Sequence, residues 1–345
     1  MFRYALLDPR PIPAAVESNE KILGAGQVFG VEVTVPALAA RCTLGNLDPQ
    51  HSGGNATRAA IEGALEVALP PEGAMLATVR PDLDAVGAMA VLGLRVDGAD
   101  LPCYDCVAGG TADGGLCSTC GNSAGIIENA SWDQILHRIA ERITLVARAD
   151  KAARGGWPGV RPLPTTENPW PEDSDGQGTA RPLAAIGAAI ADHKLPIEER
   201  VAVMREWLLT GEEPLGYRGR TEAERAELVA ALESGAIEVS LVADGRIAVV
   251  ESTHRAASMV GYMRAPVIVA RNPTFRMAGG EPHVKFTVGT FEPDFADIKS
   301  ALTELASLEE GWGGSPTVGG SKQGVASTLT TDEVVRVVTK HLAKN

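Results

Sequence analysis

The segment 74-AMLATVRPDLDAVGAMAVLGL-94 constrains the fold more than any other stretch of this chain. It reads as a strand, a tight turn and an apolar helix. A strand that is apolar throughout is typical of one covered on both faces, as in a parallel sheet. A strand and its exit are predicted over residues 28–43, and a helix over residues 55–69. Because helices and strands alternate, we predict an α/β N-terminal domain with a mostly parallel sheet.

Size and charge limit the function classes. The chain has 345 residues, and 45% of them are apolar, which is enough for about two domains with cores of their own. Its formal net charge is −13, which argues against a groove for a long nucleic acid. A small phosphorylated ligand in a locally basic pocket remains compatible with that charge.

The chain start gives no sign of export. The apolar piece of MFRYALLDPRPIPAA is too short for a signal sequence, and no stretch approaches the ~20 apolar residues that cross a bilayer. We therefore expect a cytoplasmic protein without a membrane partner. The sequence leaves the formation of a homo-oligomer open.

The remaining pattern predicts a second, smaller α/β domain. We expect an α/β domain over residues 1–215, a helical linker over 216–235 and a C-terminal substrate-binding domain over 236–345. Asp244-Gly245 sits between two alternating stretches, as in a hairpin. The Pro/Gly-rich segment 155–182 is either a lid or an ordered surface loop. Helices are predicted over 131–155, 183–195, 197–211, 221–235, 294–309 and 330–342, and strands over 265–273 and 283–291.

Four of the five cysteines form two close pairs. Ten residues separate the pair Cys103 and Cys106 from the pair Cys117 and Cys120. Two such pairs on a glycine-rich hairpin can present four thiolates to zinc, and a closed site of this kind is structural. An iron–sulfur cluster is the alternative, whereas disulfides are disfavoured without a secretory signal. Cys42 stands apart and is expected to be a small buried hydrophobe.

Two aspartates follow the predicted strand over residues 74–79. Asp82 and Asp84 lie at its carboxyl end, where open α/β sheets bind ligands. Two carboxylates so close repel each other unless a divalent cation or another positive group lies between them. The alternative is that Asp84 caps the helix while Asp82 starts the turn.

Two further polar stretches are weaker candidates. Asp48 and His51 precede Gly53-Gly54 and could contact a ligand, although a histidine in a turn is more often a polar loop residue. Asp192 and His193 end a predicted helix, where a histidine can simply complement the helix dipole.

The stretch 309-EEGWGGSPTVGGSKQG-324 is a candidate anion site. Clustered glycines serve either a tight turn or a backbone that an anion can approach closely. Cationic and imidazole side chains occur shortly before it, and the alternative is a connection packed for shape alone. The predicted substrate-binding residues are Arg276, His283, Lys285, Gly313, Gly314, Gly319 and Gly320, together with His51.

Two of these motifs resemble the DHH phosphoesterase superfamily. PDLDAVGA at 81–88 is similar to its first motif, Pro-Asp-x-Asp-Ala-x-Gly-Ser/Ala. The run from VKFTVGT to GWGGSPTVGG resembles the DHH-associated C-terminal domain, where a strand and a helix precede a Gly-Gly-Gly-His-x-x-Ala-Gly loop. The resemblance spans most of residues 74–340 but neither the cysteine segment nor the first 70 residues.

The resemblance implies a site with manganese-type divalent ions and a bridging water that attacks a phosphodiester or pyrophosphate. Asp82 and Asp84 would be metal ligands, and Lys285 would pair with phosphate in an interdomain cleft. The departures are specific: Thr78 and Ser315 stand where the family has histidines, and no Asp-His-His occurs. Asp150 would then stand in for a later aspartate, and His51, Asp192 and His193 could compensate.

Two functions follow from these patterns. The first is a metal-dependent phosphoesterase, using Mn²⁺ or Mg²⁺ beside a structural zinc, that acts on a small phosphorylated or nucleotide-type substrate. The second is a catalytically degenerate, zinc-stapled scaffold that binds a ligand or a protein partner. Nucleic-acid binding by the cysteine segment is disfavoured because residues 107–116 contain no lysine or arginine.

Overall fold

The computed structural model divides the chain into two compact units, which are described separately. Unit 1 comprises Met1–Lys151 and Arg181–Thr221, and unit 2 comprises Ala152–Ala180 and Glu222–Asn345. The described residues 157 and 159–171 of the proline- and glycine-rich segment belong to unit 2. The structure describes residues 1–10, 12–24, 26–49, 58–102, 126–152, 157, 159–171, 180–276, 281–322 and 324–344.

Unit 1 is built on a four-stranded parallel sheet with the strand order β1-β4-β2-β3. The predicted α/β class with a parallel sheet is confirmed. The central strands β2 and β4 are almost wholly buried, which explains why they contain no alternation of polar residues. The strands are β1 (Arg3–Leu6), β2 (Val28–Val31), β3 (Asn46–Leu47) and β4 (Met75–Thr78).

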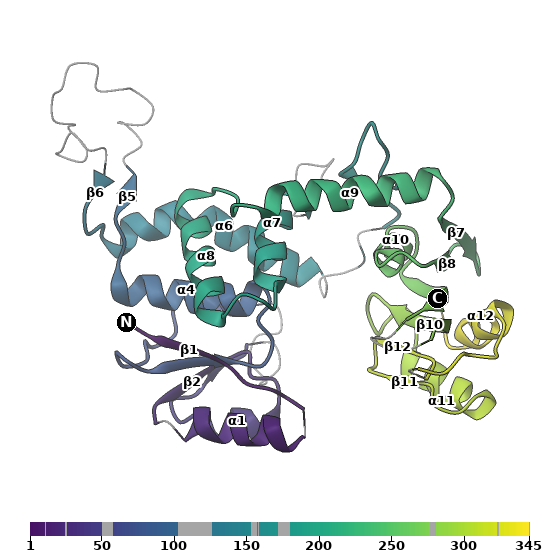
Figure 1. Ribbon diagram of the computed structural model, residues 1–345, viewed down its shortest axis with the longest axis horizontal. Coiled ribbons are helices and arrows are strands. Elements are labelled where there is room, and N and C mark those ends of the chain that lie inside the picture. Colours follow the sequence, from purple (N-terminus) through teal and green to yellow (C-terminus); the bar gives the residue numbers. More distant parts are fainter. Residues whose placement is uncertain are drawn as a thin grey trace. The chain divides into compact units, whose positions relative to one another are not determined.

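Helices cover both faces of this sheet (Figure 1). Helix α1 (Pro13–Leu23) lies on one face, and α4 (Leu83–Asp97) and α8 (Ile197–Thr210) pack on the other. Helices α6 (Trp132–Ala152) and α7 (Ala180–Ala191) lie on the α4 side. Four apolar side chains of α6 at helical spacing, Ile135, Ile139, Ile143 and Val146, are buried in that core. The parallel order brings the carboxyl ends of the strands to one edge.

The predicted helix over residues 55–69 is largely replaced by other structure. In its described part only α3 (Ala60–Gly63) is helical, and turns follow it. Gly63 is a weak helix former and Pro70 cannot continue a helix, so the apolar pattern alone overstated the length. Helix α2 (Pro36–Ala39) is equally short. Strands β5 (Leu101–Pro102) and β6 (Ile126–Ile127) pair antiparallel on either side of the predicted cysteine segment.

Unit 2 contains a six-stranded mixed sheet with the order β11-β12-β10-β9-β8-β7, in which only β8 and β9 are parallel. The predicted hairpin at Asp244-Gly245 joins β7 to β8, and both residues have positive φ angles. Helix α9 (Tyr217–Glu233) runs into this unit. The strands are β7 (Ile237–Val242), β8 (Ile247–Ser252), β9 (Val267–Phe275), β10 (His283–Thr290), β11 (Gly313–Gly314) and β12 (Val318–Gly320).

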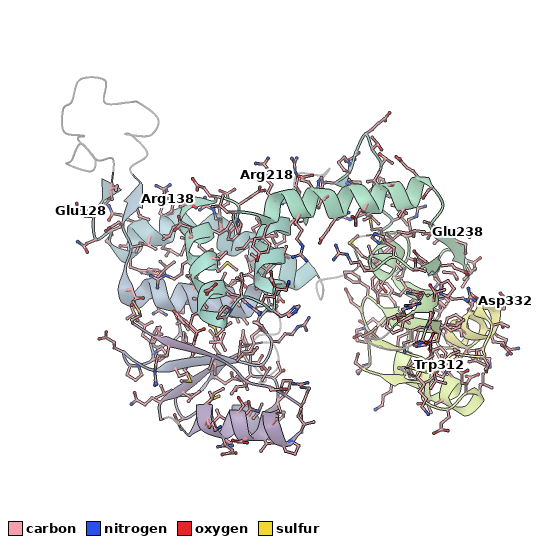
Figure 2. All side chains as sticks on the ribbon, viewed as in Figure 1. Glu128, Arg138, Arg218, Glu238, Trp312 and Asp332 are labelled. Atoms are coloured by element: carbon pink, nitrogen blue, oxygen red, sulfur yellow. The ribbon has the colours of Figure 1, made fainter. Side chains whose placement is uncertain are left out.

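The two faces of the unit 2 sheet are covered unequally. Helices α11 (Ile298–Leu308) and α12 (Thr331–Lys340) pack on one face, and the short α10 (Ala257–Tyr262) packs over β8 and β9 on the other. Trp312, labelled in Figure 2, lies in the core between the sheet and helices α11 and α12. It stacks on Phe286 with ring centroids 6.1 Å apart. Within the described ranges, no helix combines the length and apolarity that a membrane crossing requires.

Candidate functional site

The turn after β4 places its two aspartates in different roles. The side chain of Asp82 caps α4 and accepts a hydrogen bond from the backbone N–H of Ala85 at 3.0 Å. Asp84 lies inside the first turn and is 2% exposed. Its two carboxylate oxygens accept hydrogen bonds from the N–H groups of Ala60 (2.7 Å) and Ile61 (2.8 Å). Asp84 therefore ties α4 to the start of α3, and each of its oxygens keeps a second lone pair.

Several carboxylates act electrostatically on one another around this turn. Burial raises the pKa of Asp84 to about 7, and the charges of Asp150 and Asp82 also raise it, against the lowering effect of the two backbone hydrogen bonds. Burial also raises the pKa of Asp82, against the lowering effect of its bond to Ala85. The exposed Arg80 lies 3.6 Å from Asp82 and lowers that pKa in part.

Glu32 is the member of the cluster that the sequence analysis missed. It directly follows β2, is 6% exposed and has a φ angle of +52°, which is uncommon for a residue other than glycine. Burial raises its pKa to about 9, and four carboxylates add to the shift: Asp84, Asp82, Asp150 and Asp48. An acidic residue at the end of an apolar strand was the available signal. We define the carboxylate cluster as Glu32, Asp48, Asp82, Asp84 and Asp150.

The cluster brings together three of the five predicted catalytic residues, namely Asp82, Asp84 and Asp150. The other two lie at the end of α7. There Asp192 accepts hydrogen bonds from the N–H of Lys194 and the hydroxyl of Tyr217, both at 3.0 Å, and these bonds lower its pKa. His193 is exposed.

Oxygen ligands of this kind suit a hard divalent cation such as Mn²⁺ or Mg²⁺. Within the described residues, however, no three His, Cys, Asp or Glu side chains lie close enough together to hold a metal ion. The donor chemistry fits the predicted metal, but the carboxylate cluster as described does not form a complete coordination set. His51 and the four predicted zinc ligands (Cys103, Cys106, Cys117 and Cys120) lie outside the described residues.

The predicted glycine loop of unit 2 is a two-stranded ribbon. Gly313 pairs with Gly320, Gly314 pairs with Gly319, and β12 continues onto β10. The ammonium group of Lys285 donates to the carbonyl of Ser321, next to the ribbon, and burial lowers the pKa of Lys285. A cavity of about 370 Å³ is bordered by the ribbon, Lys285 and Thr287. Three of the four predicted glycines, Gly313, Gly319 and Gly320, thus border one cavity with Lys285, and Gly314 pairs with Gly319 in the ribbon.

Close backbone approach explains why some of these positions are glycine. A Cβ at Gly320 would lie 2.3 Å from the backbone oxygen of Phe286, whereas a Cβ at Gly313 would meet nothing within 4 Å. We expect Gly320→Ala to lower the free energy of unfolding by roughly 2 kcal/mol, because β12 must move away from β10. Gly313→Ala, the matched control, should change it by less than about 0.5 kcal/mol. Urea unfolding measures both, and equal effects would contradict the pairing of β10 with β12.

His283 and Arg276, the remaining predicted substrate-binding side chains of unit 2, differ in exposure. His283 is 8% exposed, and its ring meets Phe275 edge-on with centroids 5.5 Å apart. Its Nδ1 lies 3.0 Å from the carbonyl of Glu281, and its buried Nε2 has no hydrogen-bond partner in the described structure. Arg276 is exposed and borders a second, larger cavity of about 580 Å³.

Comparison with known proteins gives little further information. No protein-family model matches the sequence, and no curated protein matches it. Among solved structures, the chain is similar to the pGpG-specific phosphodiesterase PggH from Vibrio cholerae, with 10% sequence identity and a TM-score of 0.32. The match covers 59% of this chain and 66% of that one, just under two thirds of its length. A likeness this weak carries no argument about function.

Proposed function

We propose that this chain is a divalent-metal-dependent hydrolase of the phosphoesterase type, acting on a small phosphorylated or nucleotide-type substrate. The observation that carries the proposal is the carboxylate cluster at the carboxyl edge of a parallel sheet. Mutual repulsion and burial make such a cluster costly, and the pKa of Glu32 near 9 expresses that cost. Perturbed carboxylates at the ligand-binding edge of an α/β sheet are typical of functional sites.

The proposal assigns separate tasks to the two units. In unit 1, Asp82 and Asp84 would hold Mn²⁺ or Mg²⁺ with help from other members of the cluster, and a bound ion supplies an activated water for attack on phosphorus. In unit 2, Lys285 and the backbone N–H groups of the glycine ribbon would bind the anionic substrate. The zinc assigned to the four cysteines would be structural.

A second candidate function rests on the environment of Asp84. Both of its oxygens already accept backbone hydrogen bonds, and the described residues contain no three-ligand metal group. These two observations favour a catalytically degenerate scaffold in which the aspartates hold α3 and α4 together. Such a protein would still bind an anionic ligand through unit 2.

An assay of phosphodiester hydrolysis distinguishes the two candidate functions. We expect the purified, zinc-saturated chain to release p-nitrophenol from bis(p-nitrophenyl) phosphate or a nucleotide from a dinucleotide when Mn²⁺ is added. Removal of the Mn²⁺ should stop the reaction, and its return should restore it. Binding of Mn²⁺ without any turnover of either substrate would exclude the hydrolase and leave the scaffold.

A further inference from the structure

The larger cavity of unit 2 opens where β8 and β9 end. It has a volume of about 580 Å³ and is bordered by the turn before α10, the last residues of β9 and two residues of β10. Phe286 and Val288 of β10 point into the core with α11 and α12, so the alternate residues Lys285 and Thr287 face the α10 side. Helix α10 packs mainly on β8 and β9, and the cavity lies beside Lys285 and Thr287 of β10.

The border of this cavity is basic in an acidic protein. Its described residues include four cationic side chains and no aspartate or glutamate, although the whole chain carries a net charge of −13. Its volume falls within the range of roughly 300–1,000 Å³ that small-molecule sites have. The four cations are Arg255, Arg271, Arg276 and Lys285.

Two of the four cations are held in place and two are free of carboxylates. Arg271 pairs with Glu251 at 2.5 Å, and Arg255 pairs with Glu224 at 2.7 Å. A guanidinium has five N–H donors, so each arginine keeps donors for a ligand. In the part of the chain that the structure describes, neither Arg276 nor Lys285 has a carboxylate within ion-pair distance. The cavity therefore has an excess of positive charge.

The turn before α10 adds a neutral donor. Nδ1 of His254 accepts a hydrogen bond from the N–H of Ala256 at 3.1 Å. The neutral ring therefore carries its proton on Nε2, which makes this atom a donor. Ser252 stiffens the same turn, because its hydroxyl accepts from the N–H of His254 and donates to the carbonyl of Ala236, both at 2.9 Å. A stiff, donor-rich wall is suited to an anion.

The larger cavity adjoins the one at the glycine ribbon, because Lys285 and Thr287 border both. We propose that the larger cavity is a second anion subsite, and that the substrate carries a second phosphate besides the one bound at the ribbon. Planar guanidinium groups bind phosphate with two parallel hydrogen bonds, which favours phosphate over other polar groups. This inference rests on the proposed function, because it describes the substrate of that site.

Calorimetric binding to the full-length, zinc-saturated chain tests the subsite without any turnover. The probes are pentyl phosphate, 1,5-pentanediol bisphosphate and 5-phosphonooxypentanoate, which carry one phosphate, two phosphates, and a phosphate with a carboxylate. We expect the bisphosphate to bind about tenfold more tightly than pentyl phosphate. A carboxylate probe that equals the bisphosphate would overturn the assignment to phosphate.

Single substitutions locate the second phosphate. Arg276→Gln removes an exposed cation of the cavity and should weaken the bisphosphate about tenfold while leaving pentyl phosphate unchanged. The matched control is Arg336→Gln, which removes an exposed cation from α12 on the opposite face of the sheet and should change neither affinity. Equal weakening of both probes by Arg276→Gln, or the same loss in both variants, would overturn the subsite.

The experiments test the proposed subsite and the proposed hydrolase activity independently. Tight bisphosphate binding that depends on Arg276, without Mn²⁺-dependent turnover, would keep the subsite and remove the enzymatic function. Mn²⁺-dependent turnover with equal affinity for one and two phosphates would keep the enzyme and remove the subsite.

Discussion

Replacement of Asp84 by asparagine is expected to abolish Mn²⁺-dependent hydrolysis, with a loss in kcat on the order of 10³-fold or more. The carboxylate is one of the two proposed metal ligands of the turn after β4, and an amide binds a divalent cation far more weakly. The substitution keeps the shape of the side chain, so most of the packing around α4 should persist. Initial rates of dinucleotide hydrolysis at saturating Mn²⁺ measure the effect.

The same substitution also tests the structural role of Asp84. An asparagine can accept only one of the bonds from Ala60 and Ile61, because its amino group faces the other N–H. We expect the free energy of unfolding to fall by about 1–3 kcal/mol. The matched control is Asp97→Asn. Asp97 lies at the other end of α4, away from Ala60 and Ile61, and pairs with Arg205. Full activity of a folded Asp84→Asn variant would contradict the assignment of Asp84 as a ligand.

Glu32→Gln is expected to remove a large pH dependence of stability. The pKa of Glu32 is raised from 4.5 to about 9 in the folded protein, so the folded state keeps a proton that the unfolded state loses near pH 4.5. The unfolded state therefore binds fewer protons across this window, and stability falls as the pH rises from about 4.5 to 9. At ~1.4 kcal/mol per pH unit, the loss is on the order of 5 kcal/mol if no other group offsets it.

Urea unfolding at pH 5.5 and pH 8.5 measures this effect. The wild-type protein should lose several kcal/mol between the two values, whereas Glu32→Gln should lose less, because glutamine resembles the protonated acid and the titration of Asp84 remains. Glu17→Gln is the control, since Glu17 is exposed and pairs with Lys21 on its own helix. If a cation fills the cluster, Mn²⁺ should stabilise the wild type most at pH 8.5, because binding displaces the proton of Glu32. The same pH dependence in both proteins would show that Glu32 is not the group that titrates.

The sequence could predict those parts of the site that depend only on residues adjacent in the chain. The apolar run before Asp82 located β4 and its carboxyl edge, since a buried parallel strand leaves a clear pattern. The partners of Asp84 could not be predicted in this way, because Ala60 and Ile61 approach it only through the packing of α3 on α4. Glu32 was missed for the same reason: its importance comes from the order of the strands, which places β2 beside β4.

The glycine segment shows the same limit in unit 2. Six glycines within residues 309–324 predicted a tight turn or an anion site, and the structure has a ribbon paired with β10. The close contact of Gly320 with Phe286 explains why position 320 is glycine. No local sequence pattern indicates this contact. Of the cations of the larger cavity, Arg276 and Lys285 were predicted to bind substrate, whereas Arg255 and Arg271 were not, because only the pairing of β8 with β9 brings them to the same place.

Elemental analysis of the purified protein tests the central claim most directly. After dialysis against Mn²⁺, the wild-type chain should contain about one zinc, held by the four cysteines, and additional manganese held by the carboxylate cluster. Asp82→Ala should keep the zinc and lose the manganese, so that zinc serves as an internal reference for folded protein. Manganese that is absent from the wild type, or fully retained in Asp82→Ala, would contradict a metal site at the carboxyl edge of the unit 1 sheet.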